Sequence, residues 1–207
     1  MKKTIAKILV AMVVALAASL PASAQFRYGP VLGATATNLT FKQELASVSQ
    51  TPGFQAGLQT ELMFPGIGFG IDFGLIYNMA GANVNLGDKL IWSSQGFGKE
   101  RIMLHQLNIP FHLRFKYTRL GGLEEYFAPF VYGGPDFNIL LGHSHCEAME
   151  WSGGDLSLTA GAGVELMRHW QVSASYNWGM TYALKTKLLT NYSARTRQWT
   201  VRVAYLF

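Results

Sequence analysis

Large apolar side chains recur at every second position along most of the chain. Between residues 107 and 117 the odd positions are all apolar or aromatic, whereas Asn108, His112, Arg114 and Lys116 stand among the even ones. A period of two is that of a β-strand whose two faces meet different surroundings. The pattern predicts eight strands, at residues 26–37, 52–64, 69–82, 101–117, 125–142, 154–167, 170–184 and 196–207.

The alternation differs in strength between segments. In the fifth, 125–142, apolar residues occupy both parities, so its two faces stay unassigned. The last segment is the clearest, and its bulky face consists of Trp199, Val201, Val203, Tyr205 and Phe207.

Alternation alone is compatible with two kinds of barrel, which differ in whether the apolar face points inward or outward. A lipocalin-like barrel turns its apolar face inward, whereas a membrane barrel turns it towards lipid. Here charges gather on the polar face and avoid the middle of the apolar face, which favours a membrane barrel. The connections also alternate between short turns and long loops, as in outer-membrane barrels. In chain order they are long (38–51), short (65–68), long (83–100), medium (118–124), long (143–153), very short (168–169) and long (185–195).

Aromatic side chains give a third indication. An aromatic girdle marks each membrane–water interface of an outer-membrane barrel. The set expected at the short-turn ends is Phe26, Tyr28, Phe64, Phe69, Phe115, Tyr117, Tyr126, Phe127, Trp170, Tyr205 and Phe207. A second set, near the long loops, is Phe54, Tyr77, Trp178, Tyr182 and Trp199.

Together these patterns predict an all-β fold, an eight-stranded antiparallel up-and-down transmembrane β-barrel formed by residues 25–207. Lipid cannot satisfy the backbone groups of an open sheet edge, so the eighth strand is expected to pair with the first. An even number of strands places both chain ends on one side. We expect that side to be the periplasm, with the barrel in the outer membrane of a Gram-negative cell.

Residues 1–24 have the features of a secretory signal peptide. Three early lysines precede an apolar run at 8–16 and an A-x-A motif at 22–24. The run is too short for a membrane-spanning helix, which needs roughly 20 residues. Without this segment, 17 basic and 12 acidic residues become 14 and 12, so the charge gives no reason to expect a nucleic-acid partner. The single cysteine, Cys146, excludes an intrachain disulfide framework.

Two segments carry motifs that resemble a known family. Residues 105–117, HQLNIPFHLRFKY, resemble the strand with an L-x-I-P start and a K-Y end in the PorT-like outer-membrane β-barrel family of Bacteroidetes. Residues 128–135, APFVYGGP, resemble the next strand of that family. The resemblance implies an outer-membrane barrel of the OmpA/OmpX type and, through the family's namesake, a link to the type IX secretion machinery. It also implies that the barrel-assembly machinery reads the end of the last strand, at Val203, Tyr205 and Phe207.

The polar parities of the predicted strands define the lumen, which in an eight-stranded barrel has just enough room for side chains. The predicted lumen residues are Arg27, Glu61, Asp72, His112, Arg114, Lys116, Asp155, Glu165 and Arg202. Four carboxylates thus meet four permanent cations. Because buried charges are costly unless paired, this balance indicates an ion-pair and hydrogen-bond network that plugs the lumen. The alternatives are a gated ion path and a catalytic pair of carboxylates.

Outside the lumen the sequence offers few candidates for chemistry. His143, His145 and Cys146 are potential zinc or copper ligands, but no second ligand pair stands at a known spacing. A rim-active enzyme needs a nucleophile, a base and an orienting group within reach of one another. The residues that the pattern places near the outer rim are His105, His143, His145, Ser93, Ser94, Ser152 and Glu100. Their spacing singles out no triad, so we expect no enzyme activity, no cofactor and no metal.

The long loops carry an excess of three basic residues. They are Lys42, Lys89, Lys99, Arg101, Lys185, Lys187, Arg195 and Arg197, against Glu44, Asp88, Glu100, Glu147 and Glu150. Such charges either bind the phosphates of lipopolysaccharide or are simply solvated.

Three hypotheses for function follow. The leading one is a structural or interaction protein that is surrounded by outer-membrane lipid and lipopolysaccharide and presents four loops. The second is an accessory component of a type IX-like secretion machine, with secretion-complex proteins as partners. The third is a rim-active enzyme that acts on lipid or peptide.

Overall fold

The computed structural model describes residues 25–41, 47–64, 66, 68–85, 99–117, 125–144, 149–182, 184–186 and 193–207. The predicted signal peptide, residues 1–24, lies outside the described residues. Eight long strands form the wall of a barrel: β1 (Gln25–Phe41), β2 (Ser47–Met63), β3 (Phe69–Asn85), β4 (Lys99–Lys116), β5 (Phe127–His143), β7 (Gly154–Leu166), β8 (Trp170–Gly179) and β10 (Ser193–Tyr205). Two short strands, β6 (Met149–Trp151) and β9 (Leu184–Thr186), add to the sheet beside the end of β10.

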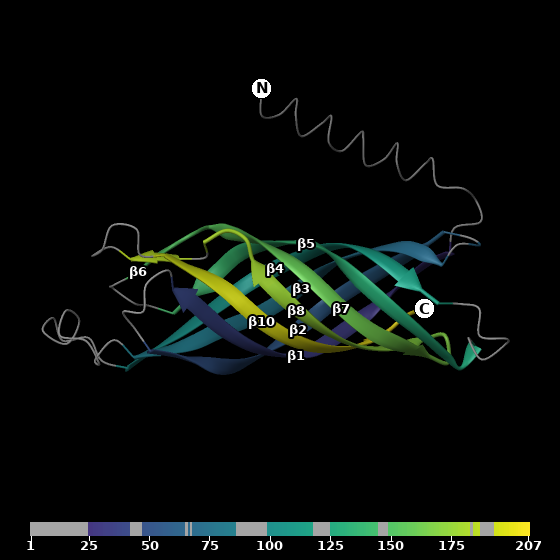
Figure 1. Cartoon of the computed structure of the whole chain (residues 1–207), viewed down its shortest axis with the longest axis horizontal. Coiled ribbons are helices and arrows are strands. Elements are labelled where there is room, and N and C mark those ends of the chain that lie inside the picture. Colours follow the sequence, from purple (N-terminus) through teal and green to yellow (C-terminus); the bar gives the residue numbers. More distant parts are fainter. Residues whose placement is uncertain are drawn as a thin grey trace, which may run out of the picture.

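The barrel is closed. Each long strand pairs antiparallel with the next, and β10 returns to β1 with a register that runs from Val31–Ala204 to Phe41–Ala194. The predicted eight-stranded antiparallel barrel is therefore confirmed. Figure 1 shows the tilted strands wrapping around one long axis, with β6 at one end and the C-terminus at the other. Among the described residues, no helix has the length and apolarity needed to cross a membrane.

The outside of the barrel is apolar and its lumen is polar. Side chains that point outward are mostly large and apolar; Leu32, Leu113 and Val203 have 65%, 66% and 41% of their surface exposed. The residues between them point into the lumen, where most of the buried side chains are polar. This is the arrangement of a barrel that faces lipid, and it is the opposite of a lipocalin-like barrel.

The strands extend further than the alternation predicted. The expected long loop at 38–51 is wrong in its extent, because β1 continues to Phe41 and β2 begins at Ser47. Likewise β3 continues to Asn85 and β4 begins at Lys99 within the expected loop 83–100. A strand that leaves the bilayer has water on both faces, so it keeps its backbone pairing without an apolar parity. Hydrophobic alternation therefore marks the part of each strand inside lipid.

The turn between β7 and β8, at the other end of the barrel, is tight. Between β7 and β8, Met167 and Arg168 both have positive φ, 50° and 62°, and the amide of His169 donates to the carbonyl of Leu166. Two central residues with positive φ match the right-handed twist of a two-residue hairpin. We refer to this end as the short-turn end, and to the end near β6 and β9 as the long-loop end.

Candidate functional site in the barrel lumen

All nine residues expected in the lumen lie on its side of the wall. Eight of them are buried, with at most 8% of their surface exposed. The ninth, Arg27, lies at the short-turn mouth, and its side chain is 17% exposed. The structure separates the nine into groups that stand at different heights. Six of them join Gln171 in what we call the inner network: Arg27, Glu61, Asp72, Arg114, Lys116, Glu165 and Gln171.

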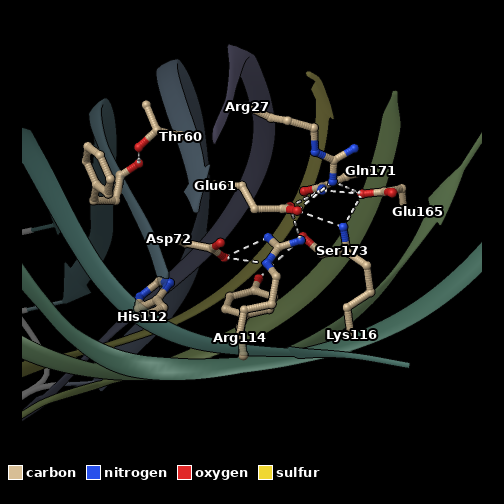
Figure 2. Close-up of polar contacts among 12 residues, drawn as sticks. Arg27, Thr60, Glu61, Asp72, His112, Arg114, Lys116, Glu165, Gln171 and Ser173 are labelled. Atoms are coloured by element: carbon tan, nitrogen blue, oxygen red, sulfur yellow. Dashed lines mark hydrogen bonds and ion pairs between the residues drawn. The ribbon is translucent and has the colours of Figure 1, made fainter. Parts of the chain in front are cut away.

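Glu61 is the centre of the inner network. Its Oε1 accepts from Arg27 Nη2 at 2.5 Å and from Lys116 Nζ at 2.7 Å. Its Oε2 lies 2.9 Å from Arg114 Nη1 and accepts from Gln171 Nε2 at 2.6 Å. Figure 2 shows these side chains converging on the carboxylate from different strands of the wall. Glu61 is fully buried, and three hydrogen-bond donors together with the Arg114 guanidinium replace the water that a buried carboxylate loses.

Glu165 shares three of these donors. Its Oε2 accepts from Arg27 Nη2, from Lys116 Nζ at 2.7 Å and from Gln171 Nε2 at 2.8 Å. Each shared donor lies between Glu61 and Glu165, and the two charged ones, Arg27 and Lys116, offset the repulsion between these carboxylates. The shared contacts join β1, β2, β4, β7 and β8. A slip of one residue would move a charge to the lipid face in β1, β2, β4 or β7, and the Gln171 amide in β8, so the network favours a single register.

Arg114 completes the network and rests on an aromatic ring. Its Nε and Nη2 both lie 2.7 Å from Asp72 Oδ2. The guanidinium carbon stands 4.0 Å from the centroid of the Phe130 ring, within the range of a cation–π contact. Phe130 in turn lies over Gly163, where a Cβ would be 2.6 Å from the ring. The inward ring thus fills the space that glycine leaves on the neighbouring strand.

The sequence interpretation missed one lumen carboxylate, Asp136. Asp136 is fully buried. Its Oδ2 accepts hydrogen bonds from the hydroxyl of Thr159 and from Asn177 Nδ2, the latter at 2.7 Å. Its Oδ1 lies 2.9 Å from His112 Nε2. The expected balance of four carboxylates and four cations is therefore wrong, because five carboxylates of the described strands face the lumen. Phe130 and Asp136 stand at positions of the same parity in β5, so both face the lumen. Because Phe130 is apolar, the sequence pattern did not identify this parity as the lumen face.

Asp155 stands apart from the ion pairs, towards the long-loop end. Gln106 Nε2 donates to it at 2.8 Å and Asn138 Nδ2 at 3.0 Å. Asn108 Nδ2 donates to Asn138 Oδ1 at 2.7 Å, and Ser157 is a further partner of Asn138. We call these five residues the amide cluster. No cation of the described strands lies within 4.0 Å of Asp155, so the prediction that it is part of an ion-paired set is wrong.

Arg202 was expected to form an ion pair in the lumen, but its partner among the described residues is an amide. Its Nε donates to Gln55 Oε1 at 3.0 Å, and no carboxylate of the described residues forms an ion pair with it. Asn78 Oδ1 accepts from Gln55 Nε2 at 3.2 Å and from Gln198 Nε2 at 3.1 Å. This row of amides continues from Arg202 across β2, β3 and β10.

The side chains leave little open space in the lumen. A cavity of about 10 Å³ lies beside the inner network, with Asp72, His112, Arg114 and Arg202 among its lining residues. That volume holds about one water molecule. A recess of about 730 Å³ opens at the short-turn end, and Arg27, Lys116 and Glu165 belong to its lining. Side chains of the inner network thus line both the recess and the narrow cavity.

The other candidate residues do not form a reactive set among the described residues. His105 Nδ1 pairs with the hydroxyl of Tyr77 on the outer wall, and His143 Nδ1 with the carbonyl of Ser144. Ser152 Oγ donates to the carbonyl of Gly154, two residues on. Ser93, Ser94, His145 and Cys146 lie outside the described residues, as does the side chain of Glu100. The described residues contain no group of three His, Cys, Asp or Glu side chains that fits a metal ion.

The expected assembly signal lies on the outer face at the short-turn end. The Tyr205 ring centroid is 5.1 Å from that of Phe207 and 5.0 Å from that of Trp170. Phe207 also approaches Tyr28 of β1, at 6.1 Å, and its amide donates to the Tyr28 carbonyl. Val203 lies further along the same face. These contacts tie the end of β10 to its neighbours on both sides.

Comparison with known proteins gives one family. The model of the family described as "Outer membrane protein beta-barrel domain" matches residues 18–184. No curated protein matches the chain. Similar solved structures include Ail of Yersinia pestis, with 14% identity over 88% of this chain and 99% of that chain and a TM-score of 0.46. They also include the Neisserial surface protein NspA (12% identity, 89% and 99% covered, TM-score 0.47) and outer membrane protein W of E. coli (14%, 86% and 97%, 0.44).

Proposed function

Because the chain belongs to the family of outer membrane protein β-barrel domains, we propose that it is a structural, non-conducting barrel whose lumen is plugged by its own side chains. The inner network carries this proposal. It crosses the short-turn half of the lumen with three cations and three carboxylates from five strands, β1, β2, β3, β4 and β7. An ion that entered would have to break several buried pairs at once, which costs several kcal/mol for each uncompensated charge.

Conductance in planar lipid bilayers tests this proposal. The mature protein, residues 25–207, is inserted from detergent at 1 M KCl, with a 16-stranded porin as a positive control for insertion. We expect current fluctuations no larger than those of protein-free bilayers. Stable, uniform conductance steps from the folded protein would refute the plugged lumen.

The proposed orientation places the short-turn end and both chain ends in the periplasm and the long-loop end outside the cell. Short periplasmic turns and long outer loops are the rule in this type of barrel. Proteinase K added to intact cells should cut within 38–51 or 185–195 and leave 65–68 intact. Cleavage at 65–68 alone would show that the orientation is the reverse of the one proposed.

We also propose that the barrel has no enzymatic activity. The described candidates at the rim bond to separate partners, and the lumen carboxylates bond to cations, amides or hydroxyls. Surrounding lipid and lipopolysaccharide, and the assembly machinery that would read Val203, Tyr205 and Phe207, are the partners proposed on this basis. Unchanged lipid A on deletion of the gene is the expected result, and a lost modification would favour an enzyme.

The two strand motifs at 105–117 and 128–135 support a proposal that the barrel is PorT-like and comes from a member of the Bacteroidetes. That affiliation makes an accessory role in a type IX-like secretion machine the alternative function. Mild detergent extraction followed by native electrophoresis separates the two. A free barrel favours the structural role, whereas a stable large complex that contains secretion proteins favours the machine.

A further inference from the structure

The outer wall of β8 and β10 carries a compact aromatic group near the long-loop end. The ring centroid of Tyr176 lies 4.6 Å from that of Trp178 and 4.7 Å from that of Trp199, in both cases edge to face. Trp178 is 37% exposed and Trp199 57% exposed on the outside of the barrel. Exposed tryptophan and tyrosine at the end of an apolar wall mark the level where hydrocarbon gives way to headgroups.

Two arginines lie on the same face of β10, between Trp199 and the long-loop end. Arg195 and Arg197 share the outward parity of Trp199, because the residues between them, Thr196 and Gln198, are buried in the lumen. At about 3.3 Å per residue, their Cα atoms lie roughly 7 and 13 Å beyond that of Trp199 along the strand. The two guanidinium groups therefore stand at the height of lipid headgroups.

The neighbouring strands provide polar groups and a ring. Arg197 lies opposite Trp178 of β8 and Asn38 of β1, and Arg195 lies opposite Thr40 of β1. Arg195 also stands over the Tyr182 ring, 5.1 Å from its centroid. No carboxylate of the described residues forms an ion pair with either arginine. Two guanidinium groups that have no carboxylate partner among the described residues, and that lie beside hydroxyl and amide groups, suit phosphate, which Arg binds with paired donors.

We propose that Arg195 and Arg197 form a binding site for the phosphates of a lipid A-type glycolipid in the outer leaflet, while Trp178 and Trp199 contact its sugar and upper acyl chains. This occupant suits two arginines on one face, because their long side chains can diverge from Cα atoms about 7 Å apart and each take one phosphate of a headgroup that carries two. A phospholipid offers a single phosphate. The site rests on the proposed orientation, which places this end of the wall in the outer leaflet.

Native mass spectrometry of the folded mature protein in detergent tests the site, with bisphosphorylated lipid A as the probe. Dephosphorylated lipid A and phosphatidylglycerol are the comparison lipids. The variants are Arg195→Gln, Arg197→Gln and the pair together. Arg168→Gln is the matched control, because Arg168 is an exposed arginine at the short-turn end whose partner is Glu125. Heat-modifiable migration on electrophoresis shows that each variant is folded.

Wild type and Arg168→Gln should bind bisphosphorylated lipid A equally and more tightly than either comparison lipid. Each single variant should bind about tenfold more weakly, the effect of one charge-assisted contact. Binding by the double variant within twofold of wild type would overturn the site. Equal binding of dephosphorylated lipid A would overturn phosphate recognition, and equal binding of phosphatidylglycerol would overturn the choice of glycolipid. Because this readout needs no cell envelope, a reversed orientation would be detected separately, by proteinase K on intact cells.

Discussion

The two ends of the lumen stabilise buried polar side chains in different ways. At the short-turn end, three cations and three carboxylates form ion pairs with distances of 2.5 to 2.9 Å. At the long-loop end, the amide cluster holds one carboxylate, Asp155, with donors from Gln106 and Asn138. The hydroxyl oxygens of Thr37 and Thr51 are buried and have no hydrogen-bond partner among the described residues. Buried hydroxyls of this kind are usually satisfied by water.

This difference suggests separate roles for the two ends: the inner network closes the lumen, whereas the amide cluster only occupies space in it. Glu61 and Glu165 each meet cations from two strands, β1 and β4, so losing one of these carboxylates leaves uncompensated positive charge inside the barrel. Amides carry both donors and acceptors, so they can exchange partners with one another and with water. We therefore expect the inner network to govern the stability and closure of the barrel, and the amide cluster to contribute little to either.

The largest effect is expected for Glu61→Gln. The substitution removes the carboxylate that Arg27, Arg114 and Lys116 share, and leaves three cations with two carboxylates. Breaking a buried pair in this way costs about 3–5 kcal/mol. Urea unfolding in lipid vesicles, followed by tryptophan fluorescence, measures the free energy of unfolding.

Glu125→Gln is the control for this substitution. Glu125 pairs with Arg168 at the short-turn end, and both side chains are more than half exposed. An exposed pair contributes about 0–1 kcal/mol. A loss in Glu61→Gln no larger than in Glu125→Gln would mean that the inner network does not determine stability.

A smaller effect is expected for Gly163→Ala, which tests the contact between the Phe130 ring and the Arg114 guanidinium. The new Cβ would lie 2.5 Å from the carbonyl oxygen of Val172 and 2.6 Å from the Phe130 ring, so both the β8 backbone and the ring must move. Overpacking of this kind costs about 1–3 kcal/mol. Gly142→Ala is the control, because a Cβ there meets nothing within 4 Å. Equal unfolding free energies for the two variants would contradict the role of the Phe130 ring.

The smallest effect is expected for Asp155→Asn in the amide cluster. The substitution removes a charge that has no cationic partner and keeps one acceptor, so we expect a change of about 1 kcal/mol or less. The same urea titration measures it. A loss as large as that of Glu61→Gln would erase the distinction between the two ends of the lumen.

Much of the barrel was predictable because lipid imposes a simple rule on each strand. Where one face meets hydrocarbon and the other the lumen, the period of two identifies the strand and its faces, as at Val203 and Arg202. Where the strands leave lipid, as at 38–41 and 47–51, that rule no longer applies. The sequence interpretation therefore ended these strands too early.

The pairing inside the lumen was not predictable from parity. Parity places Arg114 on the lumen face, but its contacts with Glu61 and Asp72 depend on how strands are staggered around the closed barrel. Asp136 was hidden because Phe130 and Tyr132 also point inward. Their rings lie against Gly163 and Gly161, whose missing side chains leave room for them. Matching inward aromatics to glycines on the next strand would have assigned the faces of 125–142.

The most direct test of the account compares the conductance of two variants in planar lipid bilayers. One, Glu61→Ser with Lys116→Ser, removes a cation and a carboxylate from the inner network without changing the net charge. The other, Gln106→Ser with Asn138→Ser, shortens two amides at the long-loop end. If the inner network closes the lumen, the first variant should give stable conductance steps and the second none. Heat-modifiable migration on electrophoresis shows whether each variant is folded. Steps from the second variant, or silence from a folded first variant, would contradict the claim that the inner network closes the lumen.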